Sequence, residues 1–291
     1  MAARHNEKLI LVAGATGRQG GATLRLLREK GYPVRAITRH PDGPKAHTLV
    51  GHGTEIVRAD LNDMPSLVRA MDGVYGVFSV QTSTENGVES EVRQGINLAD
   101  AAKRSRVSHF VYSSVGSADR RTGIPHFESK FRIEEHVRSS GLRYTILRPV
   151  FFMENWLGMR DSIEQGVLAL PLDPETRLQM IAVRDIGVFA TMSFERSGHW
   201  EGRAVDIAGD ELSMHEIADS LGRLAGRAIG YRHIPWEQFE QTAGHDMTLM
   251  YRWFQDVGYN VDIAALRQEH PNLMSFERWL QTNWRPKTQT A

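Results

Sequence analysis

Three glycines spaced three residues apart, Gly14, Gly17 and Gly20, follow the apolar run of residues 9–13. A helical pattern begins directly afterwards, at residues 18–30. Glycines in such a turn allow a tight bend, a close approach of the backbone to a pyrophosphate, and close packing of helix on strand. The free amides and the positive end of the helix dipole would then face the phosphates. This context predicts a dinucleotide phosphate site, the alternative being a tight turn without a ligand.

The end of the second expected strand, residues 33–38, carries Thr38 and Arg39. Sites that prefer NAD usually carry an acidic residue near this position, where it accepts the ribose hydroxyl groups and repels a 2′-phosphate. A guanidinium is permanently charged and can bind a phosphate through two hydrogen bonds. The sequence therefore predicts NADP(H) over NAD(H) as the cofactor. The alternative is that Arg39 is an ordinary surface arginine at the start of a loop.

Ser113, His126 and Lys130 are the candidates for catalysis. Ser113 ends the expected strand 107–113, and the other two lie four residues apart on the helical pattern 126–139, so they share one face. In hydride-transfer enzymes of this architecture, a strand-end serine works with a tyrosine and a lysine at this spacing. Here His126 stands in place of the tyrosine. Histidine can act as a general acid near neutral pH, but its ring is shorter than a phenol. A helix-start residue without a catalytic task and a surface lysine are the alternatives.

The chain resembles the NmrA-like family of atypical short-chain dehydrogenases/reductases, which includes the HSCARG-like NADPH-binding proteins. The resemblance covers nearly the whole chain, and its specificity lies in the combination of motifs. The matching segments are residues 14–20 (GATGRQG), 38–41 (TRHP), 60–61 (DL), 112–114 (YSS), 126–130 (HFESK), 148–149 (RP) and 152–155 (FMEN). The family often lacks the catalytic tyrosine, as this chain does.

The resemblance also implies a role for individual residues. It places the pyrophosphate on the turn amides, the 2′-phosphate on Arg39 and the nicotinamide ribose on Lys130. Asp60 and Leu61 would border the adenine, and Gln81 and Thr82 would border the nicotinamide half. The implied cofactor-binding residues are Gly14, Thr16, Gly17, Arg18, Gln19, Gly20, Arg39, Asp60, Leu61, Gln81, Thr82, Lys130, Phe152, Met153, Glu154 and Asn155, of which the last four would line the nicotinamide pocket. The aromatic residues in and around that last segment are equally compatible with ordinary core packing.

Two functions fit these residues. The first is an oxidoreductase that transfers hydride between NADPH and a small organic substrate of quinone or carbonyl type, in which catalysis is mostly positioning. The second is a non-catalytic sensor of the NADPH/NADP redox state that regulates a protein partner. The resemblance covers both, because some family members are reductases and others sense the cofactor ratio. The oligomeric state is left open, with a homodimer as one option.

Composition restricts the partners and the compartment. Lysine plus arginine and aspartate plus glutamate each number 35, so no net charge attracts nucleic acid or an anionic membrane. The absence of cysteine excludes disulfides, thiolate catalysis and cysteine metal sites, and no other metal-ligand spacing occurs. Residues 1–7 are polar without a signal-peptide core, and no apolar run approaches the length of a membrane span. We expect a cytoplasmic protein that contacts neither nucleic acid nor membrane.

The elements that must position these residues alternate along the first half of the chain. Strands are expected at residues 8–13, 33–38, 54–59, 74–79, 107–113 and 143–148, and helices near 18–30, 63–71, 86–105 and 126–139. Apolar strands that alternate with helices predict an α/β fold with a doubly wound parallel sheet, the Rossmann architecture, in which ligands lie beyond the carboxyl ends of the strands. We expect residues 1–150 to form the NADP(H)-binding domain. Residues 151–291 would form a smaller α+β region for substrate or partner, interwoven with the first.

Overall fold

The chain divides into two compact units in a computed structural model that describes residues 7–49 and 54–284. Unit 1 comprises Met1–Arg148 and Ile186–Asp206, and unit 2 comprises Pro149–Asp185 and Ile207–Ala291. The segment Ile186–Asp206 therefore returns to unit 1, whereas the expected boundary at residue 150 assigns it to the second region. The polar segment 1–6, on which the expectation of no signal peptide rests, lies outside the described residues.

A seven-stranded sheet in the order β10-β6-β5-β4-β1-β2-β3 forms the centre of unit 1. Its strands are β1 (Ile10–Val12), β2 (Val34–Thr38), β3 (Thr54–Arg58), β4 (Gly76–Ser79), β5 (His109–Ser113), β6 (Tyr144–Pro149) and β10 (Ala204–Ile207). Every pair from β3 through β6 is parallel. The central strands β1, β4 and β5 are buried along their whole length, because helices cover both faces of a doubly wound sheet. The expected α/β doubly wound sheet is confirmed.

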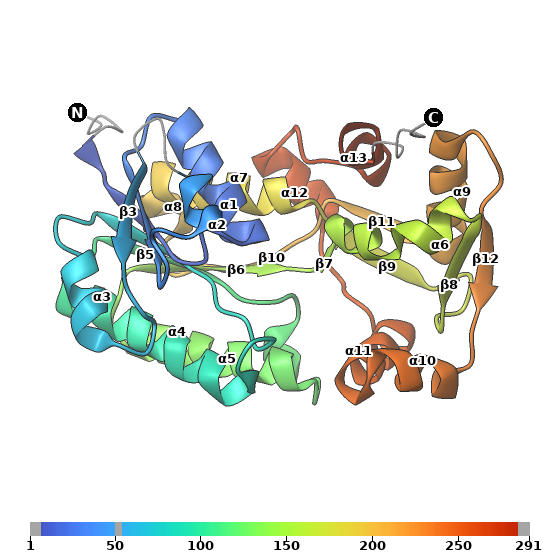
Figure 1. The fold of residues 1–291 in the computed structure, drawn as a ribbon, viewed down its shortest axis with the longest axis horizontal. Coiled ribbons are helices and arrows are strands. Elements are labelled where there is room, and N and C mark those ends of the chain that lie inside the picture. The colour runs from blue at the N-terminus through green and yellow to red at the C-terminus, as the bar shows by residue number, and fades with distance from the viewer. Residues whose placement is uncertain (1–6, 50–53, 285–291) are drawn as a thin grey trace. The chain divides into compact units, whose positions relative to one another are not determined.

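Helices pack on both faces of this sheet (Figure 1). Those of unit 1 are α1 (Arg18–Glu29), α2 (Pro44–His47), α3 (Met64–Ala70), α4 (Gly87–Arg104), α5 (Pro125–Ser139), α7 (Val183–Glu195), α8 (Ser197–Trp200) and the short η2 (Ala118–Arg120). α3, α4 and α5 cover one face, and α1 and α7 cover the other (Figure 1). The four helices expected from the sequence all form, although each differs from its expected bounds by a few residues at its ends.

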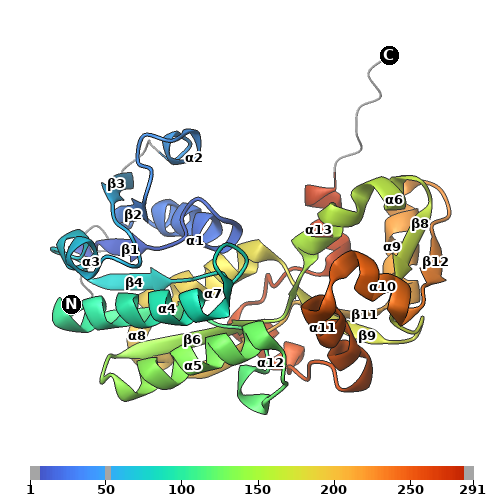
Figure 2. The same cartoon turned by 60° about the horizontal axis from the view of Figure 1, so that its bottom comes forward.

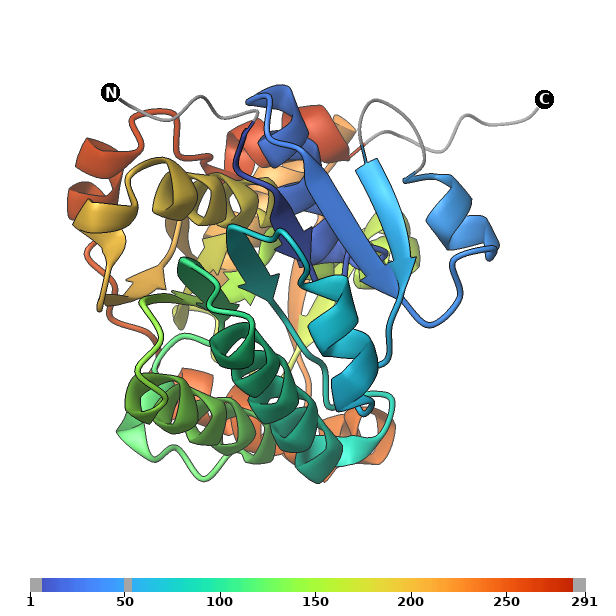
Figure 3. The ribbon, with the colours of Figure 1, turned by 90° about the vertical axis from the view of Figure 1, so that its left-hand side faces the viewer.

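Two glycines allow helices of unit 1 to approach their neighbours closely. A Cβ on Gly95 of α4 would lie 2.6–2.9 Å from side-chain atoms of Ile133 on α5. Figures 2 and 3 show these two helices running beside each other. On the other face, a Cβ on Gly187 of α7 would lie 2.8 Å from Leu26 Cδ1 of α1. Both helices carry residues of the candidate site, so the close packing of α4 on α5 brings these residues together.

Unit 2 is smaller and mixes short strands with helices, as expected for an α+β region. Its strands form one sheet in the order β11-β9-β7 and a second, parallel pair, β12-β8. They are β7 (Phe151–Phe152), β8 (Val167–Leu170), β9 (Arg177–Ile181), β11 (Asp210–Ser213) and β12 (Gly230–His233). The helices are η3 (Met153–Met159), α6 (Arg160–Glu164), α9 (Met214–Ala225), α10 (Trp236–Ala243), α11 (His245–Asp256), α12 (Ile263–Glu269) and α13 (Phe276–Asn283). Its aromatic core includes Trp156, Phe276 and Trp279, all fully buried.

Candidate functional site

The turn between β1 and α1 is shaped by its glycines. Gly14 has φ +65°, a left-handed conformation that favours glycine, and its carbonyl oxygen accepts a hydrogen bond from Gly17 N at 2.9 Å. A Cβ on Gly20 would overlap the carbonyl group of Gly14 and lie 2.8 Å from the carbonyl oxygen of Ala13. Gly14 is therefore required for the bend, and Gly20 is required for packing of the helix on the turn.

The first turn of α1 offers backbone donors to a ligand. Gly17 occupies the N-cap, no side chain among the described residues caps this helix, and the first turn contains no acidic residue. Thr16, Gly17 and Arg18 are exposed. Amides at an uncapped helix N-terminus attract an anionic group. An exposed, uncapped helix start that packs tightly on a glycine turn fits the pyrophosphate of a dinucleotide.

Arg39 lies at the end of β2 but already has a partner. Its Nη2 donates to Glu85 Oε2 at 3.0 Å, and both side chains are at least half exposed. Glu85 belongs to the loop after β4, so this ion pair joins the loops that follow β2 and β4. Arg58, at the end of the neighbouring β3, lies 3.6 Å from Asp42 Oδ2. No local sequence pattern indicates the contact with Glu85, because the two residues are 46 positions apart.

The next predicted residues follow β3 and β4. Asp60 Oδ1 accepts from the backbone N of Asn62 at 2.8 Å, and so closes a local turn. Leu61 packs against the core, and Thr82 is exposed. Gln81 is buried; its Nε2 donates to Ser79 Oγ at 3.0 Å, while its Oε1 has no hydrogen-bond partner among the described residues.

Ser113 and Gln19, two of the predicted residues, meet in the structure. Ser113 Oγ, at the end of β5, donates to Gln19 Oε1 in the first turn of α1 at 2.6 Å. The neighbouring Ser114 Oγ is buried without a hydrogen-bond partner in the described part of the chain. Burying a polar atom without a partner is unfavourable, and each such case calls for an explanation. Ser114 Oγ and Gln81 Oε1 lie at the carboxyl ends of β5 and β4, where a doubly wound sheet binds its ligand.

Lys130 reaches this edge of the sheet from α5. Its Nζ donates to Glu91 Oε1 of α4 at 2.7 Å and to the carbonyl oxygen of Gln81 at 3.2 Å. An ammonium has three N–H donors, so one is left without a partner among the described residues. Ser129 Oγ donates to the second carboxylate oxygen, Glu91 Oε2, at 2.5 Å. The Glu91 side chain is fully buried and that of Lys130 is 13% exposed, so the alternative of an ordinary surface lysine does not hold.

His126 and Tyr112 are the remaining groups that could move a proton. His126 lies in the first turn of α5, one turn before Lys130, with its ring against Phe127. Tyr112 lies within β5, and its hydroxyl group has no hydrogen-bond partner among the described residues. Burial, with a smaller contribution from the negative charges of Glu91 and Glu134, raises the pKa of Tyr112 well above its ordinary value. Tyr112 therefore stays neutral.

The predicted segment Phe152–Asn155 belongs to unit 2, where β7 passes into η3. Met153 is fully buried. The carboxylate of Glu154 accepts from the backbone N of Val183 at 3.0 and 3.1 Å and from Trp279 Nε1 at 3.0 Å. Glu154 thereby holds together parts of unit 2 that are distant in sequence. Its predicted place in a nicotinamide pocket stays a prediction.

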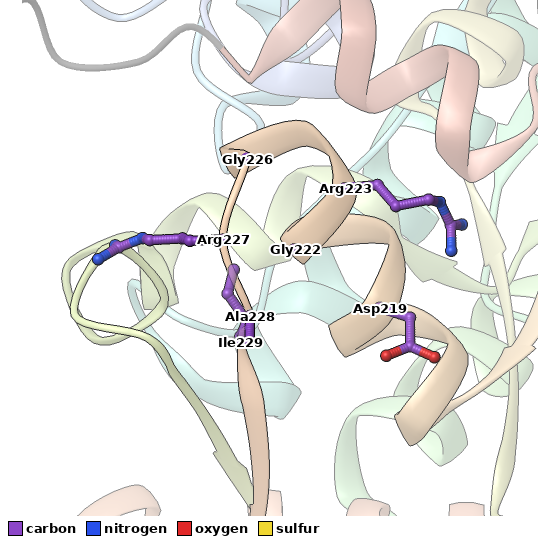
Figure 4. Close-up of a pocket in the computed structure, with 7 residues that line it drawn as sticks. All are labelled: Asp219, Gly222, Arg223, Gly226, Arg227, Ala228 and Ile229. Carbon is purple, nitrogen blue, oxygen red and sulfur yellow. The ribbon is translucent and has the colours of Figure 1, made fainter.

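The hollows in the described part of the chain include two that are open to solvent. One, of about 360 Å³, lies in unit 1 beside the glycine turn and α2, and includes the cationic side chains of Arg25 and Lys45. The other, of about 400 Å³, lies in unit 2 at the end of α9. Figure 4 shows that Arg223 and Arg227 at this second hollow point in opposite directions. Because its charged groups do not converge, we place the candidate site in unit 1.

A model of the NmrA-like family matches residues 6–280. The chain belongs to the NmrA-like family. One similar protein is the NAD(P)H azoreductase of Xenophilus azovorans, which is 35% identical over 237 residues. The aligned region covers 80% of this chain and 79% of the azoreductase. The resemblance inferred from the motifs is thus confirmed over nearly its whole predicted extent.

Solved structures of NmrA-like proteins share the fold. NmrA, a negative transcriptional regulator in complex with NADP, superposes with a TM-score of 0.78 at 23% identity and covers 94% of both chains. The Citrobacter sp. triphenylmethane reductase complexed with NADP(H) has a TM-score of 0.81 at 20% identity, covering 94% of this chain and 99% of the reductase. Among the described residues of this NmrA-like chain, no helix has the length and apolarity needed to cross a membrane.

Proposed function

We propose that this NmrA-like protein is an NADP(H)-dependent oxidoreductase that transfers hydride between NADPH and a small organic substrate of quinone or carbonyl type. The observation that carries the proposal is the glycine cradle at the end of β1, next to a strand edge where Lys130 presents an N–H donor. A relative named as an NAD(P)H azoreductase and a structural neighbour named as a triphenylmethane reductase support reduction of a small organic acceptor in general.

Different residues of unit 1 would bind different parts of the cofactor. The amides around Gly17 would bind the pyrophosphate, and Arg39 would bind the 2′-phosphate after leaving Glu85. Lys130 would donate its third N–H to the nicotinamide ribose. Gln81 Oε1 and Ser114 Oγ would supply further polar contacts at the ends of β4 and β5. When bound, the nicotinamide supplies the hydride.

Few side chains at the proposed site can donate a proton to the substrate. Tyr112 is buried and neutral, and Ser113 Oγ already donates to Gln19. His126 is an ionisable group that lies one turn before Lys130 on the same helix. Acceptors that need no strong acid when they receive a hydride, such as quinones, suit this arrangement best. Catalysis would then consist mainly of holding the acceptor and the cofactor in a reactive geometry.

An absorbance assay tests this proposal. Purified protein and NADPH are mixed with each of a panel of quinones, dyes and carbonyl compounds, and oxidation of NADPH is followed by the loss of its absorbance. Lys130→Ala should abolish turnover. Lys103→Ala is a matched control, because Lys103 is an exposed lysine whose Nζ donates, within the described residues, to the carbonyl oxygen of Gly141 and to no acidic side chain. Turnover that survives in Lys130→Ala would refute the role of Lys130. Tight NADPH binding without oxidation of any acceptor would instead favour the second candidate function.

The second candidate is a sensor of the NADPH/NADP ratio that regulates a protein partner, and the structural neighbour NmrA, a negative transcriptional regulator, supports it. Both redox forms carry the 2′-phosphate, so release of Glu85 from Arg39 would signal that a nucleotide is bound, whereas sensing of the ratio requires a response to the nicotinamide itself. Limited proteolysis should then differ between NADP⁺-bound and NADPH-bound protein, and a partner should be captured in only one of these two states. A cytoplasmic location and a small-molecule or protein partner stay predictions.

A further inference from the structure

Glu91 is a buried acid whose only cationic partner among the described residues is Lys130. Its side chain is fully buried on α4, with one carboxylate oxygen on Lys130 Nζ and the other on Ser129 Oγ. The close approach of α4 and α5 at Gly95 and Ile133, one turn further along both helices, brings these groups together. Both carboxylate oxygens are satisfied, so the position of the Lys130 ammonium is fixed from the protein side.

The pair carries no net charge. The positive charge of Lys130 and the negative charge of Glu91 lie 2.7 Å apart, and the nearby phenol of Tyr112 is neutral. A buried ion pair usually contributes little to stability compared with apolar residues of the same volume. Structural support between α4 and α5 therefore does not require it. Its effect on a ligand beside Lys130 is electrostatic: Glu91 cancels the field that Lys130 alone would exert.

The two redox forms of the proposed cofactor differ by one charge at the nicotinamide ring, which is positive in NADP⁺ and neutral in NADPH. We infer that Glu91, by neutralising Lys130, sets the relative affinity of the site for NADP⁺ and NADPH. Glu91 acts through Lys130 and the local field, so it is a positioning and specificity residue rather than a catalytic one. This inference rests on the proposed function, in which Lys130 lies at the nicotinamide ribose.

Glu91→Gln tests the inference, because it removes the charge but keeps the shape and polarity of the side chain. The uncompensated ammonium should then repel NADP⁺ and leave NADPH nearly unaffected. One unit charge acting over roughly 10 Å at an effective dielectric constant of about 20 changes a binding ratio by about tenfold. We expect the ratio of the NADP⁺ to the NADPH dissociation constant to rise by about that factor.

Two further variants complete a charge cycle. Lys130→Gln leaves the carboxylate uncompensated, so the same ratio should fall, even though both nucleotides bind more weakly. The double variant Glu91→Gln/Lys130→Gln is neutral again and should return the ratio to the wild-type value. Glu134→Gln is the matched control, because Glu134 is also fully buried but pairs with Arg148. It should lower stability and leave the ratio unchanged.

Calorimetric titration of NADP⁺ and NADPH at pH 6.5, without any acceptor, measures all these ratios independently of turnover. A merely structural role would weaken both nucleotides by the same factor in Glu91→Gln, and that result would overturn the inference. If Glu91→Gln does not fold, a Lys130→Gln ratio equal to wild type overturns it as well. Wild-type protein that binds neither nucleotide would instead refute the proposed function, so the two failures are distinguishable.

Discussion

Replacing Gly20 by alanine adds a methyl group where the turn after β1 has no room. The added Cβ would overlap the carbonyl group of Gly14 and lie 2.8 Å from the Ala13 oxygen. These neighbours are backbone atoms, so the helix must move away from the turn. Overpacking of this kind costs about 1–3 kcal/mol. For a chain of this size we expect the melting temperature to fall by about 2–5 °C.

Gly17 provides the comparison within the same motif. Its φ of −96° and ψ of −178° suit any residue, and an added Cβ would have a single neighbour, the Gly14 oxygen, at 3.2 Å. Gly17→Ala at an N-cap should cost at most about 1 kcal/mol. Since Gly17 is exposed beside the proposed phosphates, however, its methyl group should weaken NADPH binding by about tenfold or more, an effect of about 1.4 kcal/mol.

Thermal unfolding followed by circular dichroism, together with NADPH titration, separates the two effects. The main effect of Gly20→Ala should be a lower melting temperature. The main effect of Gly17→Ala should be weaker NADPH binding, with little change in the melting temperature. Equal melting temperatures for the two variants would show that the Gly20 contact does not restrict the helix. Wild-type NADPH affinity in a folded Gly17→Ala protein would show that the phosphates do not approach this turn.

Three other substitutions have expected outcomes. Glu85→Gln frees Arg39 from an exposed ion pair, so NADPH should bind about threefold tighter, while NADH, which lacks the 2′-phosphate, should change less; equal gains for both would contradict the pairing argument. Burial, and to a lesser degree the positive charge of Arg143, lowers the pKa of His109 from 6.5 to about 4. Between about pH 6.5 and 4, His109 is therefore protonated in the unfolded chain but stays neutral in the folded chain. The corresponding stability is fully present above pH 6.5 and is lost as the pH falls, by about 3 kcal/mol in all. Urea unfolding across this range should show a shallower pH dependence in His109→Asn, and an unchanged slope would refute the assignment. Arg148→Met leaves the fully buried Glu134 without its bidentate partner and should cost about 3–5 kcal/mol. Adding Glu134→Gln should recover part of the lost free energy of unfolding, as measured by chemical denaturation. If it recovers none, the unpaired carboxylate of Glu134 is not the cause of the destabilisation.

Local sequence patterns were sufficient for the glycine turn and for the doubly wound parallel sheet of unit 1, although not for the order of its strands or for the addition of β10 at its edge. The bend at Gly14 and the packing at Gly20 depend on residues next to them in the chain, and parallel strands joined by helices restrict the topology to few arrangements. The pairing of His126 and Lys130 on one helix face likewise follows from their spacing. Such features depend on interactions over a few residues, and the sequence specifies them directly.

Contacts between distant segments were missed, because nothing local distinguishes them. Glu154 and its partner Trp279 are 125 positions apart, and Arg39 and Glu85 are 46 apart. One signal was available for Glu91: it lies four residues before Gly95 and seven before Leu98, in the stripe of α4 that faces the core. A charged residue in an apolar helix stripe indicates a buried partner, and Lys130 was the candidate cation.

The chain passes three times between its two units, at residues 148–149, 185–186 and 206–207. A fragment that stops at residue 148 lacks β10 at the sheet edge and α7, whose residues Ile186, Phe189 and Phe194 are fully buried. The ribosome therefore completes unit 1 only after it has already made the first segment of unit 2. For the same reason, chimaeras that exchange the second half at a single junction should aggregate. A workable exchange of unit 2 with that of a relative must keep residues 186–206 from the parent of unit 1.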